Sequence, residues 1–144
     1  MSPQFVQHPQ VSLDLALELV RAALDQGETA GVPISVAVSD ASGNLVASAR
    51  MDASPLGAMR LAVDKAYTAA LWQMPSGDLH ESSQPSGDDW GITSTEGGRV
   101  VVYPGGFPIF AGTTLAGAIG VSGGTGEQDA ECAQAALRSV LPAG

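Results

Sequence analysis

Three charged side chains stand beside apolar sequence and are the first candidates for chemistry: Arg50, Asp52 and Lys65. Arginine offers a planar fork of donors to a carboxylate and lysine offers a point charge, so Arg50 and Lys65 are suited to hold an anionic group. Apolar neighbours on both sides of Lys65 would lower its pKa, as a base or a Schiff-base amine requires. The ordinary alternative is that Asp52 accepts amides at a helix start or pairs with Arg50, and that Lys65 is solvated or pairs across an interface.

Imidazoles are scarce, since His8 and His80 are the two histidines of the chain. Each can ligate a metal, but no HxH or HxxxH spacing supports a two-histidine site, and an ordinary surface position explains both. Tyr67 and Tyr103 are alternative oxygen ligands or hydrogen-bond donors, and core packing explains them equally well.

Two possible nucleophiles lie near the C-terminal end. Ser122 stands in the sequence GVSG, which lacks the GxSxG pattern, and no histidine is spaced for a triad. We expect its hydroxyl and the neighbouring amides to satisfy a turn, or to bind a ligand anion near a helix N-terminus. Cys132 is the only cysteine, so an intrachain disulfide, a cysteine zinc site and an iron–sulfur cluster are excluded. Its alanine neighbours predict a small buried residue.

The elements that must position these residues centre on a predicted β-hairpin. Residues 107–111 and 115–121 are short apolar runs bounded by glycine, which is typical of buried strands joined by a tight turn. Gly117 and Gly120 interrupt the second run, and glycine inside a strand indicates that another backbone, a bulge or a ligand comes close. We therefore expect a hollow for a small molecule beside these glycines, against an alanine-rich helix.

Three main helices are predicted around the hairpin. The middle helix has no clean polar face, which indicates contact on two sides, with the sheet and with a neighbouring subunit or a ligand. The predicted helices are residues 12–26 with Ser12 as N-cap, 54–73 with Ser54 as N-cap and Pro55 in the first turn, and 127–141 after a capping box of Thr125 and Gln128.

Five strands are predicted in total. Residues 33–40, 45–51 and 99–103 join the two strands of the hairpin, and because strands adjacent in the chain form hairpins, the sheet should be mainly antiparallel. With helices packed on it, the chain is predicted to form an α+β layered domain. Residues 82–98 are polar and glycine-rich, which predicts a surface loop bordering a site, with Trp90 as its one anchor.

Composition predicts a single domain over residues 1–144, with 1–10 as a loose arm. A formal net charge of −9 with six lysines and arginines argues against a nucleic-acid partner. The absence of a signal-peptide pattern and of about 18 consecutive apolar residues argues against a membrane and favours the cytoplasm. Small side chains, including 18 glycines, make a thin core, so further apolar surface should be buried against other copies of the chain.

Four motifs in order resemble the GlcG/HbpS family of small haem-binding or haem-degrading proteins, also found as the C-terminal domain of PduO-type corrinoid adenosyltransferases. They are ISVAVSDASGNLVASARMD, DKAYTAAL, GGFPIF and GAIGVSGGTGEQDAECAQAA. The similarity runs from about Leu13 to Leu141. It implies a five-stranded antiparallel sheet flanked by helices, like that of profilin or roadblock domains, and a homo-oligomer (a dimer, tetramer or octamer).

Individual residues match the motifs of this family. Residues 50–52 match its RMD motif, and Lys65 and Ala66 match a KA pair on the following helix. Residues 105–108 match a glycine-glycine-x-proline loop, while Gly117, Gly120, Ser122 and Gly123 match a strand-to-helix signature. The loop 82–98 has no clear counterpart.

The resemblance implies an oligomeric protein that holds haem or a related tetrapyrrole in a cleft between sheet and helices. Its iron would be bound by a histidine, for which we name His80, with His8 as the alternative. The expected ligand-binding residues are Arg50, Tyr103, Gly105, Gly106, Ser122 and Gly123.

Two other functions are left open by the sequence. One is a cofactor-independent enzyme of a catabolic or biosynthetic pathway that acts on a small carboxylated substrate, with Lys65 and Asp52 as catalytic residues, Arg50 at the site and residues 82–98 as a lid. The other is a purely structural or partner-binding role.

Overall fold

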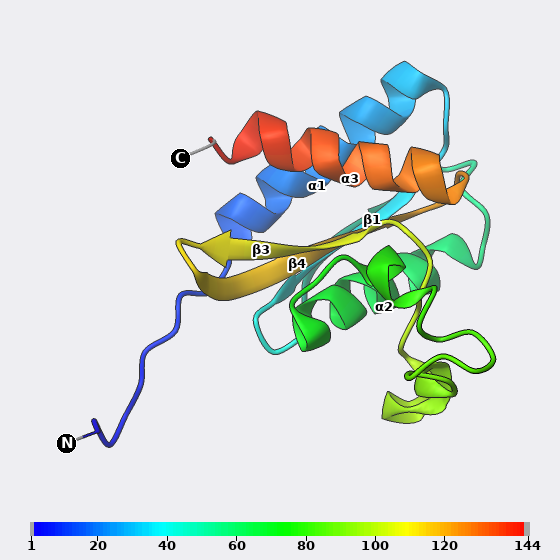
Figure 1. Ribbon diagram of the computed structural model, residues 1–144. Helices are drawn as coiled ribbons and strands as arrows, with labels where there is room; N and C mark the ends of the chain where they lie inside the picture. Colours follow the sequence, from blue (N-terminus) through cyan, green and yellow to red (C-terminus); the bar gives the residue numbers. More distant parts are fainter. Residues whose placement is uncertain (1, 143–144) are drawn as a thin grey trace.

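The computed structural model describes residues 2–142 and shows one sheet between two helical layers (Figure 1). The main elements in chain order are α1 (Leu13–Ala30), β1 (Ser35–Asp40), β2 (Leu45–Arg50), α2 (Ala58–Trp72), β3 (Gly106–Ala111), β4 (Thr114–Ser122) and α3 (Gly126–Val140). Short 3₁₀ turns lie between α2 and β3, namely η1 (Ser76–Leu79), η2 (Ile92–Ser94) and η3 (Glu96–Gly98).

The sheet has the order β2-β1-β4-β3, and each neighbouring pair is antiparallel. Helices α1 and α3 cover one face and α2 covers the other (Figure 1). The predicted hairpin is confirmed as β3 and β4, and the two strands predicted after the first helix are confirmed as β1 and β2. The predicted α+β class with an antiparallel sheet flanked by helices is therefore correct.

The prediction of five strands is wrong, because the sheet has four. Residues 99–103 do not pair with it. Val100 and Val102 are buried in a small cluster with Leu79 of η1, and the Val101 amide donates to the Thr68 hydroxyl of α2 at 3.0 Å. The apolar character that indicates a strand here arises because the segment is buried beside α2 and η1.

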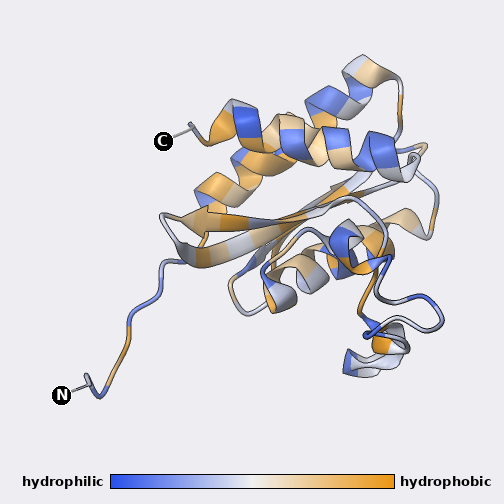
Figure 2. Ribbon diagram, in the orientation of Figure 1, coloured by the Kyte–Doolittle hydropathy of each residue, from blue (hydrophilic) through white to orange (hydrophobic). Residues whose placement is uncertain are grey.

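The core lies on both faces of the sheet. On the side of α1 and α3, Val36 and Val38 of β1 and Ile119 and Val121 of β4 pack together. On the side of α2 the contacts are between small residues, Ala66 and Ala69 of the helix with Leu115 and Ala118 of β4. In Figure 2 the sheet carries hydrophobic colour, while hydrophilic colour is prominent on the outer turns of α1 and α3. Small side chains on the α2 face allow that helix to lie close to the sheet.

Glycine in β4 provides room for protein rather than for a ligand. A Cβ atom at Gly120 would collide with the Ala62 carbonyl oxygen of α2 and lie 2.7 Å from the Ala66 amide nitrogen. A Cβ at Gly117 would collide with the Ser39 carbonyl oxygen of β1. The close approach of another backbone is thus confirmed, and the hollow predicted beside these two glycines is not formed there.

Helix ends follow local sequence at two of three N-termini. The Ser12 hydroxyl accepts from the Leu15 amide at the start of α1, and the capping box of Thr125 and Gln128 begins α3. The middle helix instead begins after Gly57, because the Ser54 hydroxyl bonds to the Ser35 hydroxyl at 2.9 Å and does not cap α2.

Helix α1 runs beyond the predicted end at Gln26 to Ala30. Gly27 lies within it, where a Cβ would be 2.8 Å from the Ile34 side chain. The helix ends at Gly31, whose φ of 70° is the left-handed conformation that glycine favours.

Residues 82–98 lie at the surface, as predicted, but Trp90 does not anchor them, since 67% of it is exposed. The segment is attached through Glu96, whose carboxylate accepts from the Tyr67 hydroxyl of α2 at 2.9 Å. Residues 2–10 form an exposed irregular arm, and Met1 lies outside the described residues, as do residues 143–144 of the predicted domain. Within the described part of the chain, no helix is both long enough and apolar enough to cross a bilayer.

Candidate functional site

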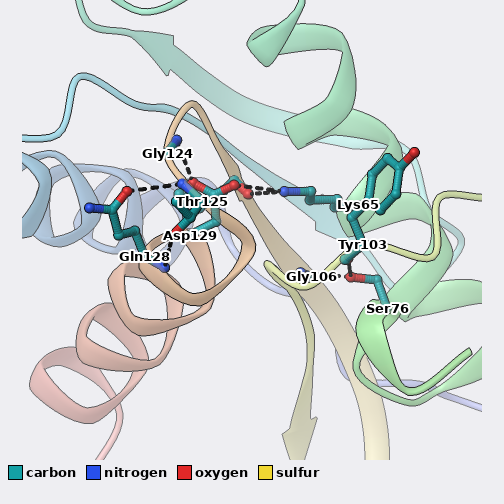
Figure 3. A network of polar contacts seen from close by, with 9 residues as sticks. Lys65, Ser76, Tyr103, Gly106, Gly124, Thr125, Gln128 and Asp129 are labelled. Atoms are coloured by element: carbon teal, nitrogen blue, oxygen red, sulfur yellow. Dashed lines mark hydrogen bonds and ion pairs between the residues drawn. The ribbon is translucent and has the colours of Figure 1, made fainter. Parts of the chain in front are cut away.

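Lys65 of α2 is the one charged residue of the three sequence candidates that the fold encloses. Only 2% of it is exposed, and its Nζ donates to Asp129 Oδ2 of α3 at 3.0 Å and to the Val121 carbonyl of β4 at 2.9 Å (Figure 3). Because α2 and α3 lie on opposite faces of the sheet, this ion pair joins the two helical layers at the end of β4.

Asp129 is the partner that the sequence analysis missed. Its Oδ1 accepts from the Gly124 amide at 2.8 Å, so one carboxylate holds both the lysine and the turn that leads into α3. The sequence contains a signal for it: Asp129 lies three and four positions before Cys132 and Ala133, which share the buried face of α3. A carboxylate on such a face needs a cationic or amide partner.

Burial lowers the pKa of Lys65 below its ordinary value, and the Coulombic attraction and hydrogen bond of Asp129 oppose that shift. The ammonium has two acceptors in the fold, so an activated amine at this position would first have to leave Asp129. The predicted direction of the Lys65 pKa shift is supported. The contacts of Lys65 with Asp129 and Val121 are those of a structural ion pair and not of a free amine.

Gly105 and Gly106 make room for this lysine. A Cβ at Gly105 would lie 2.9 Å from Lys65 Nζ, and one at Gly106 would collide with the Lys65 carbonyl oxygen. The Gly106 amide donates to the Ser76 hydroxyl at 2.9 Å, and that hydroxyl donates to the Tyr103 carbonyl at 2.7 Å (Figure 3). The positions that side chains at 105 and 106 would take are therefore occupied by the protein itself, and a ligand-binding role for these two glycines stays a prediction.

Ser122 and Gly123 form the tight exit from β4. Ser122 is 4% exposed and lies opposite Ser35 in the sheet register. Gly123 has a φ of 131°, and a Cβ there would be 2.5 Å from the Pro33 carbonyl oxygen. Their positions agree with a role in the turn. Cys132 is a small buried residue, as predicted, and burial raises the pKa of its thiol.

The remaining candidates are at the surface. Arg50 lies exposed at the end of edge strand β2, and Asp52 is exposed in the following turn. His80 is exposed after η1, and Tyr103 is 55% exposed. Lys65 is buried and bonds to neither Arg50 nor Asp52, which are both exposed, so the three proposed enzyme residues share no polar contact.

His8 lines a surface hollow of about 380 Å³ at the end of the sheet, with Gln10, Gln73 and the turn between β3 and β4. Its lining is mostly polar. Over residues 2–142, no group of three or more histidine, cysteine, aspartate or glutamate side chains could hold a metal ion. A metal bound here would need another source of ligands, such as a porphyrin.

Comparison with known families gives a match over most of the chain. The family model described as haem degrading protein HbpS-like matches residues 11–138. The corrinoid adenosyltransferase PduO of Salmonella typhimurium is 33% identical over 123 residues, which are 85% of this chain and 37% of PduO. The chain thus spans little more than a third of that relative.

Solved structures agree with this match. The crystal structure of protein ORFY from Klebsiella pneumoniae has a TM-score of 0.96 and 26% identity, covering 100% of this chain and 99% of that one. The crystal structure of a PduOC–haem complex has a TM-score of 0.88 and 32% identity, covering 94% of this chain and 97% of that one.

Proposed function

The chain belongs to the HbpS-like family, and from that premise we propose that it binds haem as a homo-oligomer. The observation that carries the proposal is the similarity to the PduOC–haem complex, with 32% identity over 94% of this chain. Identity at this level over nearly the whole chain supports a shared ligand chemistry.

The surface carries side chains of the two kinds that haem binding requires. Haem needs an axial ligand for iron and cationic groups for its propionates. His80 and His8 are exposed imidazoles, and Arg50 is an exposed guanidinium. Haem would supply a redox-active iron whose reactivity depends on the axial ligand. This chain's own residues would bind it, orient it and limit the access of water.

A single chain does not provide apolar walls in the hollow that His8 lines, since most of that lining is polar. Several large apolar side chains are nevertheless exposed elsewhere. They include Phe5 and Val6 of the N-terminal arm and Leu13 and Leu17 of α1. We propose that a second copy covers part of this surface and completes the haem site.

The experiment is titration of haemin into the purified full chain, followed by absorbance. We expect a saturable Soret shift in the parent protein. His80→Ala should remove or alter it if His80 ligates iron, and His8→Ala should do so if His8 does. Gln84→Ala is the control for His80, because its amide contacts the His80 carbonyl and not the imidazole.

Absence of a Soret shift in the parent protein would refute haem binding. A shift unaltered in both single variants and in the double variant would refute histidine ligation alone. The enzyme alternative has less support, because Lys65 is paired with Asp129 and lies apart from the exposed Arg50 and Asp52.

A further inference from the structure

The C-terminal end of α2 and the 82–98 segment line a second, open surface hollow of about 410 Å³. Its walls contain both indole rings, those of Trp72 and Trp90, which are 44% and 67% exposed. Two exposed indole side chains that line one hollow form an apolar patch, and such patches mark binding surfaces. We propose that this hollow binds an organic ammonium cation, such as an alkyl or quaternary ammonium group.

Charge in the hollow is of one sign. Asp89 and Glu96 line it together with the two indoles, and its seven lining residues include no lysine, arginine or histidine. Carboxylates attract a cation by Coulombic attraction, and indole rings attract it through their quadrupole. Tryptophan gives the strongest cation–π interaction of the aromatic side chains.

The carboxylate of Glu96 is held in place before any ligand arrives. Its Oε2 accepts from the Tyr67 hydroxyl at 2.9 Å, which leaves Oε1 for another donor. Tyr67 is in turn covered by Arg99, whose guanidinium carbon is 3.7 Å from the ring centroid and whose Nε donates to Asp64 at 3.0 Å. Arg99 therefore interacts with the Tyr67 ring and the Asp64 carboxylate, and it is not part of the hollow's lining.

Helix α2 adds to the same field. It ends at Trp72, which is one of the lining residues, and the C-terminus of a helix carries partial negative charge. A hard divalent cation is the less suitable ligand, because no cluster of three or more acidic, histidine or cysteine ligands occurs in residues 2–142. Indole faces and two separate carboxylates fit a large, weakly hydrated cation better.

The protein contains two tryptophans, and both line this hollow, so its intrinsic fluorescence reports directly on the site. The test is a fluorescence titration of the full chain with choline chloride. The control ligand is 3,3-dimethylbutan-1-ol, which has the shape of choline without its charge, and sodium chloride at equal ionic strength is the control for salt. We expect a saturable change with choline and none with either control.

Three variants test which carboxylates contribute to choline binding. Glu96→Gln should weaken choline binding about tenfold, and Asp89→Asn should act in the same direction. Glu81→Gln removes an exposed carboxylate outside the hollow and should leave the affinity unchanged. Circular dichroism of each variant establishes that the fold is kept.

The proposal is overturned by a titration with no saturable change, which is also the outcome if a second copy of the chain covers both indoles. It is equally overturned if the neutral alcohol binds as well as choline, or if Glu81→Gln weakens binding as much as Glu96→Gln. These measurements use protein without haem, so their outcome is independent of the haem titration.

Discussion

At Lys65 and Asp129 two full charges are held out of water, with 2% and 3% of the side chains exposed. Each charge has replaced its lost hydration with protein partners, Lys65 with a carboxylate and a carbonyl, Asp129 with the ammonium and an amide. Because the low-dielectric surroundings make an unpaired charge costly, the two residues depend on each other. Gly105 leaves space for the side chain of Lys65, and Gly106 lets β3 approach the Lys65 backbone.

We predict that Lys65→Met lowers the free energy of unfolding by about 3 kcal/mol, because Asp129 is left buried without its cation. Lys65→Met with Asp129→Leu should recover a large part of that loss, since no charge is then buried. Arg138→Met is the control, as it breaks the exposed pair with Glu131 and should change stability by less than about 1 kcal/mol. Urea denaturation measures all three, and a Lys65→Met protein as stable as Arg138→Met would contradict the structural role.

At the scale of elements, α2 lies close to the sheet because the residues between them are glycine and alanine. Gly120 of β4 faces the α2 backbone at Ala62 and Ala66, and the helix surface there is alanine. Close packing of this kind increases the contact area of small residues, which compensates for a core with few large side chains. It also explains why a glycine-rich strand here indicates a neighbouring helix and not a ligand cavity.

We predict that Gly120→Ala destabilises the protein by about 2 kcal/mol or more, because its Cβ cannot fit without moving α2. Gly57→Ala, just before α2, is the matched control. A Cβ at Gly57 meets no atom within 4 Å, and its φ of −75° suits any residue. The midpoints of urea denaturation should therefore separate the two variants. Equal midpoints would show that α2 can shift away from the sheet at little cost.

At the scale of the whole molecule, apolar side chains remain on the surface. Leu13 and Leu17 of α1 are 57% and 50% exposed although they follow the helical spacing of core positions, whereas Leu19 on the adjacent face is fully buried. The residues that α1 buries are Ala16, Leu19, Val20, Ala23 and Gly27, so Leu13 and Leu17 lie to one side of its packed face. An exposed leucine pair on one helix is suited to contact between copies of the chain.

We predict that native mass spectrometry of the parent protein shows an oligomer and that Leu13→Asp with Leu17→Asp shifts it toward monomer, because a buried carboxylate pair opposes association. Leu56→Asp is the control, since Leu56 is 85% exposed in the turn before α2 and lies on a different element. A monomeric parent protein would contradict the oligomer. An oligomer dissociated by Leu56→Asp alone would move the interface away from α1.

The sequence by itself determined the elements that depend on interactions between residues close together in the chain. The β3–β4 hairpin, the Ser12 cap and the capping box before α3 depend on residues a few positions apart, so spacing and turn chemistry predict them. The family motifs likewise lie in continuous stretches. Tertiary structure decided what depends on distant partners: the Lys65–Asp129 pair joins residues 64 positions apart, and residues 99–103 are buried against α2 without joining the sheet. Burial and pairing at such separations depend on how the layers pack. The local sequence around an apolar run or a charged residue does not show which distant residue it will contact.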